Sequence, residues 1–92
     1  MNVLIIGSGG REHALAQVIK KSKKLHELYV VPGNPGIAKF AKCIDINPLD
    51  NELIREFALD NDISLVIPGS EVYLENGIND IFNNTDVLVF GP

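Results

Sequence analysis

Apolar and polar positions along this chain follow two alternating periods. Five short apolar runs, bounded by turn residues, predict β-strands that are largely buried. Between several of these runs, apolar residues recur at the three- and four-residue spacing of a helix face. The strands are expected at Asn2–Ile6, Leu28–Val31, Cys43–Ile46, Ser64–Ile67 and Val87–Phe90, and the helices at residues 11–22, 48–60 and 72–83.

Alternation of strands and helices from end to end predicts the fold class. It is typical of an α/β, Rossmann-like domain: an open, mostly parallel five-stranded sheet with helices on both faces. We expect the strand order 3-2-1-4-5. The connection over residues 37–42 is too short for a full crossover helix. A hairpin-like or edge pairing of the third strand therefore remains open.

The helical segments carry apolar residues that predict their buried sides. Asn47 is expected to cap the second helix, with Pro48 in its first turn. The predicted buried positions are Ala14, Leu15, Val18 and Ile19 in the first helix, Leu49, Leu53, Ile54, Phe57 and Ala58 in the second, and Leu74, Ile78, Ile81 and Phe82 in the third.

Composition bounds the class of protein. The chain has 92 residues, of which 46% are hydrophobic and 22% charged, as in an ordinary globular domain. No apolar run approaches the roughly 20 residues of a membrane span, and the N-terminus lacks the features of a secretory signal. We therefore expect a cytoplasmic protein with no membrane partner. Cys43 is the only cysteine, so neither an internal disulfide nor a cysteine-based zinc site is predicted.

Charge is distributed unevenly between the two halves of the chain. The formal net charge is −4, but residues 1–47 carry seven Lys and Arg against three Asp and Glu, whereas residues 48–92 carry one against nine. The only basic cluster is Lys20, Lys21, Lys23 and Lys24. It lies where the first helix should end, and cations complement the negative end of a helix dipole there. A nucleic-acid partner is not expected.

A glycine-rich turn, Gly7 to Glu12, follows the first strand and opens the first helix. Free N–H groups at such a helix start form an anion site, although a tight turn without a ligand explains the same glycines. A dinucleotide fingerprint has a third glycine and a carboxylate after the next strand. Here Glu12 stands at that glycine, and Pro32 to Gly36 supply no carboxylate. A dinucleotide cofactor is therefore disfavoured.

Three loops should meet at one edge of the predicted sheet. Ligands of open α/β sheets bind outside the carboxyl ends of the strands, where neighbouring connections diverge. Strands one, two and four would be neighbours in the expected order. Their loops, Gly7–Glu12, Gly33–Gly36 and Gly69–Glu71, would then border a single crevice.

Four segments of the chain carry a family resemblance. GSGGREHAL, VVPGNPGIA, LVIPGSEVYLENGI and the final VFGP resemble the first domain of the phosphoribosylamine–glycine ligase family, whose members are also called glycinamide ribonucleotide synthetases. The resemblance covers essentially all 92 residues. It implies the pre-ATP-grasp domain of a carbon–nitrogen ligase that uses ATP to join glycine to 5-phosphoribosylamine in purine synthesis.

The resemblance also implies which parts of the enzyme are missing. Residues 1–92 form a single N-terminal domain, expected to be a fragment without the ATP-grasp and C-terminal domains. ATP and Mg (or Mn) are expected in the full-length enzyme, but no cofactor, metal ligand or catalytic residue is expected in this fragment. We expect it to be inactive alone and to help bind phosphoribosylamine beside the remaining domains of its own chain.

Residue by residue, the resemblance predicts a substrate-binding set. The glycine-rich turn would bind the 5-phosphate, and the other two loops would bind the sugar or its amine. Structural roles that need no ligand also stay open for these residues: an ion pair between Arg11 and Glu12, a plain turn at Asn34–Gly36, and a favourable interaction of Glu71 with the helix dipole. The predicted set is Gly9, Gly10, Arg11, Glu12, Asn34, Pro35, Gly36 and Glu71.

Some positions near the predicted site have an open role. Ser70 and Tyr73 stand where the family usually has prolines, which leaves the placement of Glu71 less fixed; Ser70 can cap the third helix and Tyr73 can stack on a ligand. His13 is either a phosphate or ribose donor or a helix-packing residue.

A second function remains open from the sequence. The chain can also be a stand-alone nucleotide- or sugar-phosphate-binding module without catalysis. What separates the two is whether the reading frame continues past Pro92 into an ATP-grasp sequence.

Overall fold

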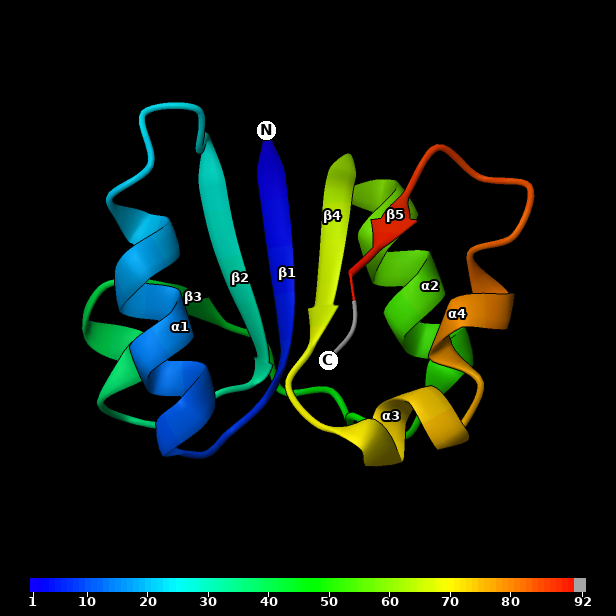
Figure 1. The fold of residues 1–92 in the computed structure, drawn as a ribbon, viewed down its shortest axis with the longest axis horizontal. Coiled ribbons are helices and arrows are strands. Elements are labelled where there is room, and N and C mark those ends of the chain that lie inside the picture. Colours follow the sequence, from blue (N-terminus) through cyan, green and yellow to red (C-terminus); the bar gives the residue numbers. More distant parts are fainter. Residues whose placement is uncertain (91–92) are drawn as a thin grey trace.

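A five-stranded parallel sheet forms the centre of the molecule (Figure 1). The computed structural model describes residues 1–90. All four neighbouring strand pairs are parallel, and the order β3-β2-β1-β4-β5 is the one predicted. The strands are β1 (Asn2–Gly7), β2 (Glu27–Pro32), β3 (Lys42–Cys43), β4 (Ile63–Pro68) and β5 (Leu88–Val89).

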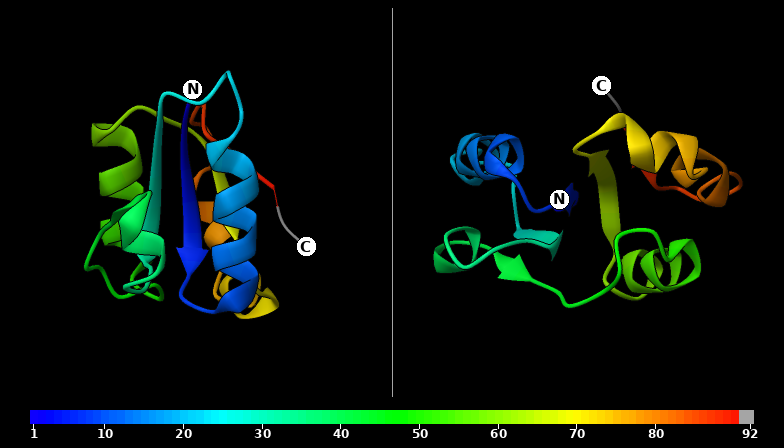
Figure 2. Two further views of the ribbon diagram at one scale, coloured as in Figure 1. Left: turned by 90° about the vertical axis from the view of Figure 1, so that its left-hand side faces the viewer. Right: turned by 90° about the horizontal axis from the view of Figure 1, so that it is seen from below.

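Helices cover both faces of the sheet, as predicted (Figure 2). On one face α1 lies over β1 and β2, and on the other α2 and α4 pack together. The helices are α1 (Gly10–Lys20), the 3₁₀ helix η1 (Ile37–Lys39), α2 (Asn51–Asp60), α3 (Glu71–Glu75) and α4 (Ile78–Ile81). In the described part of the chain, no helix is long and apolar enough to cross a membrane.

The central strand β1 divides the core into two layers. Its side chains alternate between the faces of the sheet, so that Leu4 and Ile6 join the layer beneath α2 and α4, while Val3 and Ile5 join the layer beneath α1. All four are buried. A strand that is apolar on both sides is typical of a parallel sheet covered by helices.

Helix α1 is rotated relative to the prediction. Ala14 and Val18 are exposed, Val18 to 68%, whereas Glu12 and Ala16 are buried. Leu15 and Ile19 pack against the core as predicted. The rotation follows from the start of the helix, because the first turn directs Glu12 toward the sheet and its i+4 neighbour Ala16 then faces the same way.

Helix α2 begins later than predicted. Its N-cap is Asp50, whose carboxylate accepts a hydrogen bond from the Leu53 N–H at 3.2 Å. Asn47 instead stabilises a separate turn by accepting from the Leu49 N–H at 2.9 Å. Leu49 lies outside the helix and is 49% exposed, and Leu53 is 46% exposed. Their predicted burial was wrong, whereas Ile54, Phe57 and Ala58 pack in the core.

The predicted third helix is two short helices. Gly77 has a φ of 87°, in the left-handed region that glycine adopts without steric cost. It separates α3 from α4 and changes the direction of the chain. Ile78 and Phe82 are nevertheless buried, and Leu74 and Ile81 pack against the same layer, so the prediction of the inward side is confirmed.

The third strand lies at the edge of the sheet, which confirms one of the two pairings left open. It runs parallel to β2, with Lys42 beside Tyr29 and Cys43 beside Val30. The hairpin-like alternative was wrong, because the single turn of η1 suffices to bring the chain back in the parallel direction. Gly91 and Pro92, the end of the VFGP segment, lie outside the described residues.

Candidate functional site

The three glycine-containing loops meet at the carboxyl edge of the sheet, as expected from the strand order. Two backbone hydrogen bonds join them: the Gly33 N–H donates to the Gly7 carbonyl at 3.1 Å, and the Gly69 N–H donates to the Ile6 carbonyl at 2.8 Å. The glycine-rich turn therefore lies between the loop after β2 and the loop after β4. We call the surface that these loops border, residues 7–12, 33–36 and 69–73, the crevice.

Asn34 fixes the loop after β2 to the glycine-rich turn. Its side-chain amide donates to the Ser8 carbonyl at 2.8 Å, and its Oδ1 accepts from the Ile37 N–H at 2.9 Å. These bonds belong to a well-formed turn and leave the second N–H of the amide for another acceptor. The side chain thus has a structural role whether or not it also contacts a ligand.

Free amide groups gather at the start of α1. Gly9 is the N-cap and supplies no capping side chain. Within residues 1–90, the N–H groups of Gly10, Arg11 and Glu12 donate to no backbone or side-chain acceptor. Such amides, together with the positive end of the helix dipole, form an anion-binding arrangement.

Arg11 extends from α1 to the loop after β4. Its Nη1 donates to the Gly69 carbonyl at 3.4 Å, and the rest of the side chain is exposed. The predicted alternative, an ion pair with Glu12, is absent, because the only salt bridge found in residues 1–90 joins Lys42 to Glu27. The guanidinium keeps most of its donors free at the crevice.

Glu12 is the only charged residue that is buried in the described part of the chain, with 8% of its surface exposed. Its side chain fills the space between Gly7 and Gly69. A Cβ atom added at Gly69 would lie 2.6 Å from the Cγ and Cδ of Glu12, and one added at Gly7 would collide with Oε1. The two glycines are therefore required for the placement of this carboxylate.

Tyr73, on α3, is half-buried, and the Glu12 carboxylate affects its ionisation. Burial raises the pKa of the Tyr73 hydroxyl above its ordinary value of 10.0, and the negative charge of Glu12 raises it further. The hydroxyl is therefore neutral at physiological pH and can donate a hydrogen bond.

The remaining predicted residues lie around the same crevice. Glu71 is the first residue of α3 and is exposed, and Pro35 is exposed in the loop after β2. Ser70 is the N-cap of α3, but its side chain makes no capping bond. The binding roles of the predicted set stay predictions.

His13 packs rather than pointing freely into the crevice. Its ring lies 5.6 Å from that of Phe40 in a tilted arrangement. A Cβ atom added at Gly36 would lie 2.9 Å from His13 Cε1. These contacts favour the helix-packing role over a donor role, and they give Gly36 a steric reason to lack a side chain.

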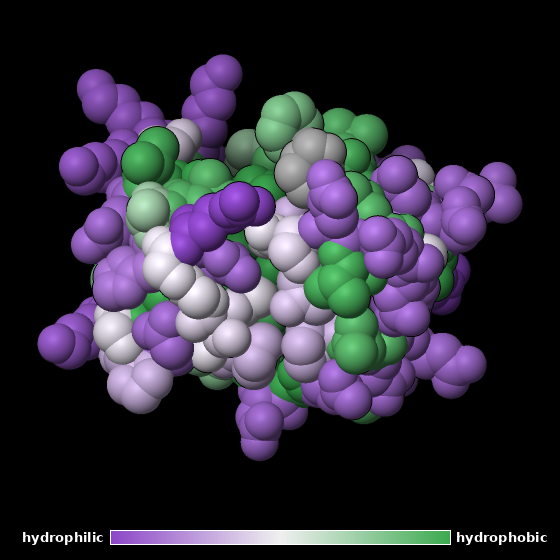
Figure 3. Space-filling model, turned by 60° about the horizontal axis from the view of Figure 1, so that its bottom comes forward, coloured by the Kyte–Doolittle hydropathy of each residue, from purple (hydrophilic) through white to green (hydrophobic). Residues whose placement is uncertain are grey.

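The surface at this edge differs in character from its surroundings (Figure 3). In the view that brings the carboxyl edge forward, residues of near-neutral hydropathy form a pale area across the middle, between strongly hydrophilic atoms. Glycine, serine and proline dominate the three loops. Much of the hydrogen-bonding capacity there comes from the backbone.

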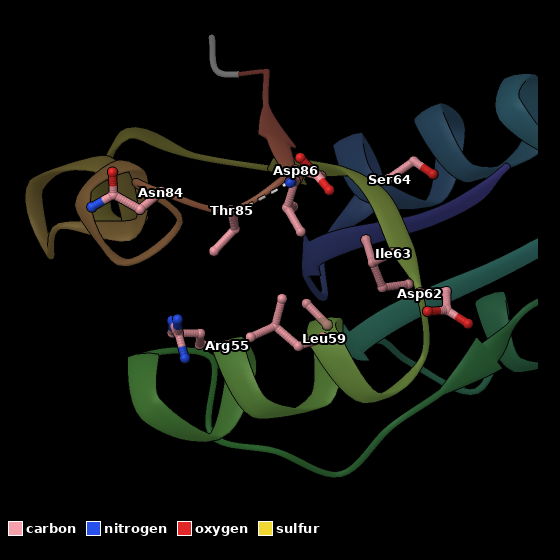
Figure 4. Close-up of a pocket in the computed structure, with 10 residues that line it drawn as sticks. Arg55, Leu59, Asp62, Ile63, Ser64, Asn84, Thr85 and Asp86 are labelled. Carbon is pink, nitrogen blue, oxygen red and sulfur yellow. Dashed lines mark hydrogen bonds between the residues drawn. The ribbon is translucent and has the colours of Figure 1, made fainter.

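A separate groove of about 530 Å³ lies at the opposite edge of the sheet (Figure 4). It is bordered by α2, by the start of β4 and by the residues before β5. Figure 4 shows Arg55, Asp62 and Asp86 on different sides of the groove, so their charged ends do not converge. Within residues 1–90, no group of three or more His, Cys, Asp and Glu side chains is placed to hold a metal ion. The groove therefore has fewer polar groups that could bind one ligand together than the crevice has.

Sequence reasoning identified the loops but missed two features of the site. It placed Glu12 in the substrate-binding set but did not predict its burial, although a glutamate at the third glycine position of the fingerprint must put its side chain near the strand ends. It also left the surroundings of Tyr73 open, because nothing local to α3 reveals contact with a residue 61 positions earlier.

The whole chain has relatives among known proteins. The family model described as "Phosphoribosylglycinamide synthetase, N domain" matches residues 1–92. The chain is 42% identical over 92 residues to the phosphoribosylamine–glycine ligase of Caldanaerobacter subterraneus, and 47% identical over 94 residues to that of Pseudomonas syringae pv. tomato. Each match covers 100% of this chain but 22% of the relative, so the chain spans about a fifth of their length.

Two solved structures share the fold. A saccharopine dehydrogenase from Saccharomyces cerevisiae matches 98% of this chain and 21% of its own, with a TM-score of 0.77 and 18% identity. A phosphoribosylamine–glycine ligase from Thermotoga maritima matches 100% of this chain and 19% of its own, with a TM-score of 0.61 and 23% identity. At these identities the structural matches show the α/β fold and nothing more specific.

Proposed function

Because the chain belongs to the phosphoribosylglycinamide synthetase N-domain family, we propose that it is the N-terminal domain of a ligase that makes glycinamide ribonucleotide. The complete enzyme uses ATP, with Mg or Mn, to join glycine to 5-phosphoribosylamine in purine synthesis. This domain helps bind phosphoribosylamine, and the remaining domains of the protein hold ATP, metal and glycine. Residues 1–90 receive no metal ligand and no catalytic residue in this proposal.

The observation that carries the proposal is the set of free amides at the start of α1. Gly10, Arg11 and Glu12 present three N–H groups without acceptors at the edge where ligands of such sheets bind. A phosphate monoester fits three converging donors and the positive helix end. The Arg11 guanidinium, held toward the crevice by the Gly69 carbonyl, adds charge-assisted donors on the same side.

The loops on either side of the amides then contact the sugar. The loop after β2 ends at Gly36 on one side, and Glu71 is an exposed carboxylate at the opposite side. A carboxylate accepts hydrogen bonds from hydroxyl or amino groups. The domain in this way orients the amine of phosphoribosylamine toward the rest of the enzyme.

One experiment tests the division of labour between the domains. The purified 92-residue chain is incubated with ATP, glycine and phosphoribosylamine, and ADP release is measured. We expect no turnover. Turnover by the chain alone would contradict the assignment of catalysis to the other domains.

A second experiment tests the substrate side. This chain replaces the corresponding part of the Halalkalibacterium halodurans ligase, to which it is 46% identical over 92 residues. In that chimera, Arg11→Ala should raise the KM for phosphoribosylamine about tenfold, the loss of one charge-assisted hydrogen bond. The KM for ATP should not change. Arg55→Ala, in the groove at the opposite edge, is the matched control, and equal effects of the two variants would contradict the proposal.

A further inference from the structure

The carboxylate of Glu12 is buried without a partner. Only 8% of the residue is exposed, and no hydrogen bond or ion pair found within residues 1–90 involves its carboxylate oxygens, which keep some contact with solvent. Burying a polar group without a partner destabilises a fold, and burying a charge does so more strongly. An unpaired carboxylate at this position therefore requires an explanation.

Two structural roles are available to a glutamate at this position, and the geometry supports neither. Glu12 is the third residue of α1, where a side chain can reach back to the N–H of the N-cap in a capping box. No such bond to Gly9 is present. An ion pair with the neighbouring Arg11 is also absent, because that guanidinium donates to the Gly69 carbonyl instead.

The carboxylate lies among the glycine residues of the loops that border the crevice. In the described residues, no side-chain nitrogen or oxygen atom that is sealed from solvent lacks a hydrogen-bond partner. The unpartnered Glu12 oxygens are therefore accessible to solvent. Oε1 lies against Gly7 and Gly69, and Oε2 would be 3.7 Å from a Cβ atom at Gly9.

The groups around Glu12 give the site a mixed charge. The free amides of α1 and the Arg11 guanidinium are positive, and the Glu12 carboxylate beside them is negative. An anion bound at the amides would therefore have a fixed carboxylate beside it. The Glu12 carboxylate would repel a second phosphate of such a ligand. It would instead bind a ligand that carries a hydrogen-bond donor at the same position.

We propose that Glu12 determines the ligand specificity of the crevice. Its carboxylate accepts a hydrogen bond from a hydroxyl or ammonium group of a sugar monophosphate whose phosphate lies on the amides of α1, and it excludes diphosphates. This inference rests on the proposed function. It explains why a glutamate occupies the third glycine position of the fingerprint and why Gly7 and Gly69 leave room for it.

The test compares ligands that share a phosphate but differ in donors. The 92-residue chain is titrated with ribose 5-phosphate, inorganic phosphate and pyrophosphate, and the dissociation constants are measured from backbone amide shifts by NMR. Glu12→Gln keeps the size of the side chain but removes its charge. Glu12→Asp keeps the charge but places the carboxylate closer to the backbone, away from the ligand. If Glu12→Gln does not fold, Glu12→Asp still tests the proposal. Glu56→Gln, an exposed carboxylate in the middle of α2, is the matched control.

The expected result is a change in selectivity. Glu12→Gln should weaken ribose 5-phosphate binding about tenfold, and should leave phosphate binding unchanged or tighter and strengthen pyrophosphate binding. Glu12→Asp should weaken ribose 5-phosphate without strengthening pyrophosphate, and Glu56→Gln should change nothing. If the chain binds ribose 5-phosphate in the crevice but the ratios do not change in the Glu12 variants, the specificity role is wrong and the proposed function stands. If the unsubstituted chain binds none of the three ligands, both proposals fail.

Discussion

Gly69→Ala should destabilise the domain because the new methyl group would occupy the space of the Glu12 side chain. The added Cβ atom would lie 2.6 Å from Cγ and Cδ of Glu12 and 2.7 Å from Oε1. Carbon atoms in contact prefer separations of about 3.5–4.0 Å, so either the backbone at position 69 or the Glu12 side chain must move by roughly 1 Å. Overpacking of this kind costs about 1–3 kcal/mol in the free energy of unfolding.

A double-mutant cycle isolates the cause of that loss. In Glu12→Ala the three nearest atoms to the new methyl group are gone, so Gly69→Ala should then cost less than about 0.5 kcal/mol. The coupling free energy between the two positions should be about 1–3 kcal/mol, beyond the error expected for independent sites. Urea unfolding followed by far-UV circular dichroism measures it, since the chain has no tryptophan.

Gly10→Ala is the control for the glycine-to-alanine change itself. A Cβ atom at Gly10 meets nothing within 4 Å, and alanine is favoured over glycine in a helix. We expect stability to be unchanged or to rise by up to about 1 kcal/mol. The reasoning is refuted if Gly69→Ala destabilises no more than Gly10→Ala, or if its cost persists in the Glu12→Ala background.

Three further predictions test other parts of the account. In an absorbance titration Tyr73 should ionise above pH 10.0. Glu12→Gln should lower the pKa of Tyr73 toward 10.0 without reaching it, because burial is the larger cause of the shift. Since the pKa is raised in the folded state, the contribution of Tyr73 to the free energy of unfolding is present below pH 10 and is lost as the pH rises through the folded-state pKa. Asp50→Ala should lower the free energy of unfolding by about 1 kcal/mol through loss of the α2 cap, whereas Asp45→Ala, an exposed carboxylate with no capping role, should leave the urea midpoint unchanged. Asn34→Ala should cost about 1–3 kcal/mol, because it removes one hydrogen bond to Ser8 in the neighbouring loop and one to Ile37 within its own turn, and a thermal melt that matches the parent would refute this.

The sheet and its order were predictable because each strand carries its own apolar signal. Leu4, Ile6 and Val66 lie in continuous apolar runs, and these predict strands buried on both faces wherever they occur in the chain. The alternation with helices then restricts the connections to parallel crossovers. The meeting of the three loops at one edge follows from that order without further information.

The errors arose where a neighbour in space decides a local choice. Asn47 and Asp50 are both residue types that commonly cap helices. Only the packing of the chain before α2 makes Asp50, rather than Asn47, the N-cap of α2. Gly77 interrupts a periodic pattern by adopting a left-handed conformation, which tertiary packing favours. Glu12 was predicted to bind substrate or to pair with Arg11, and its burial was not predicted because it depends on Gly69, which lies 57 positions later in the chain.

The most direct test of the central claim is a titration of the isotope-labelled chain with ribose 5-phosphate, a stable stand-in for phosphoribosylamine in which a hydroxyl replaces the amine. Backbone amide shifts are followed by NMR. If the crevice binds the sugar phosphate, the shifts concentrate at Gly9–Glu12, at Asn34–Gly36 and at Glu71. Shifts at the groove around Arg55, or none at millimolar ligand, would contradict the account.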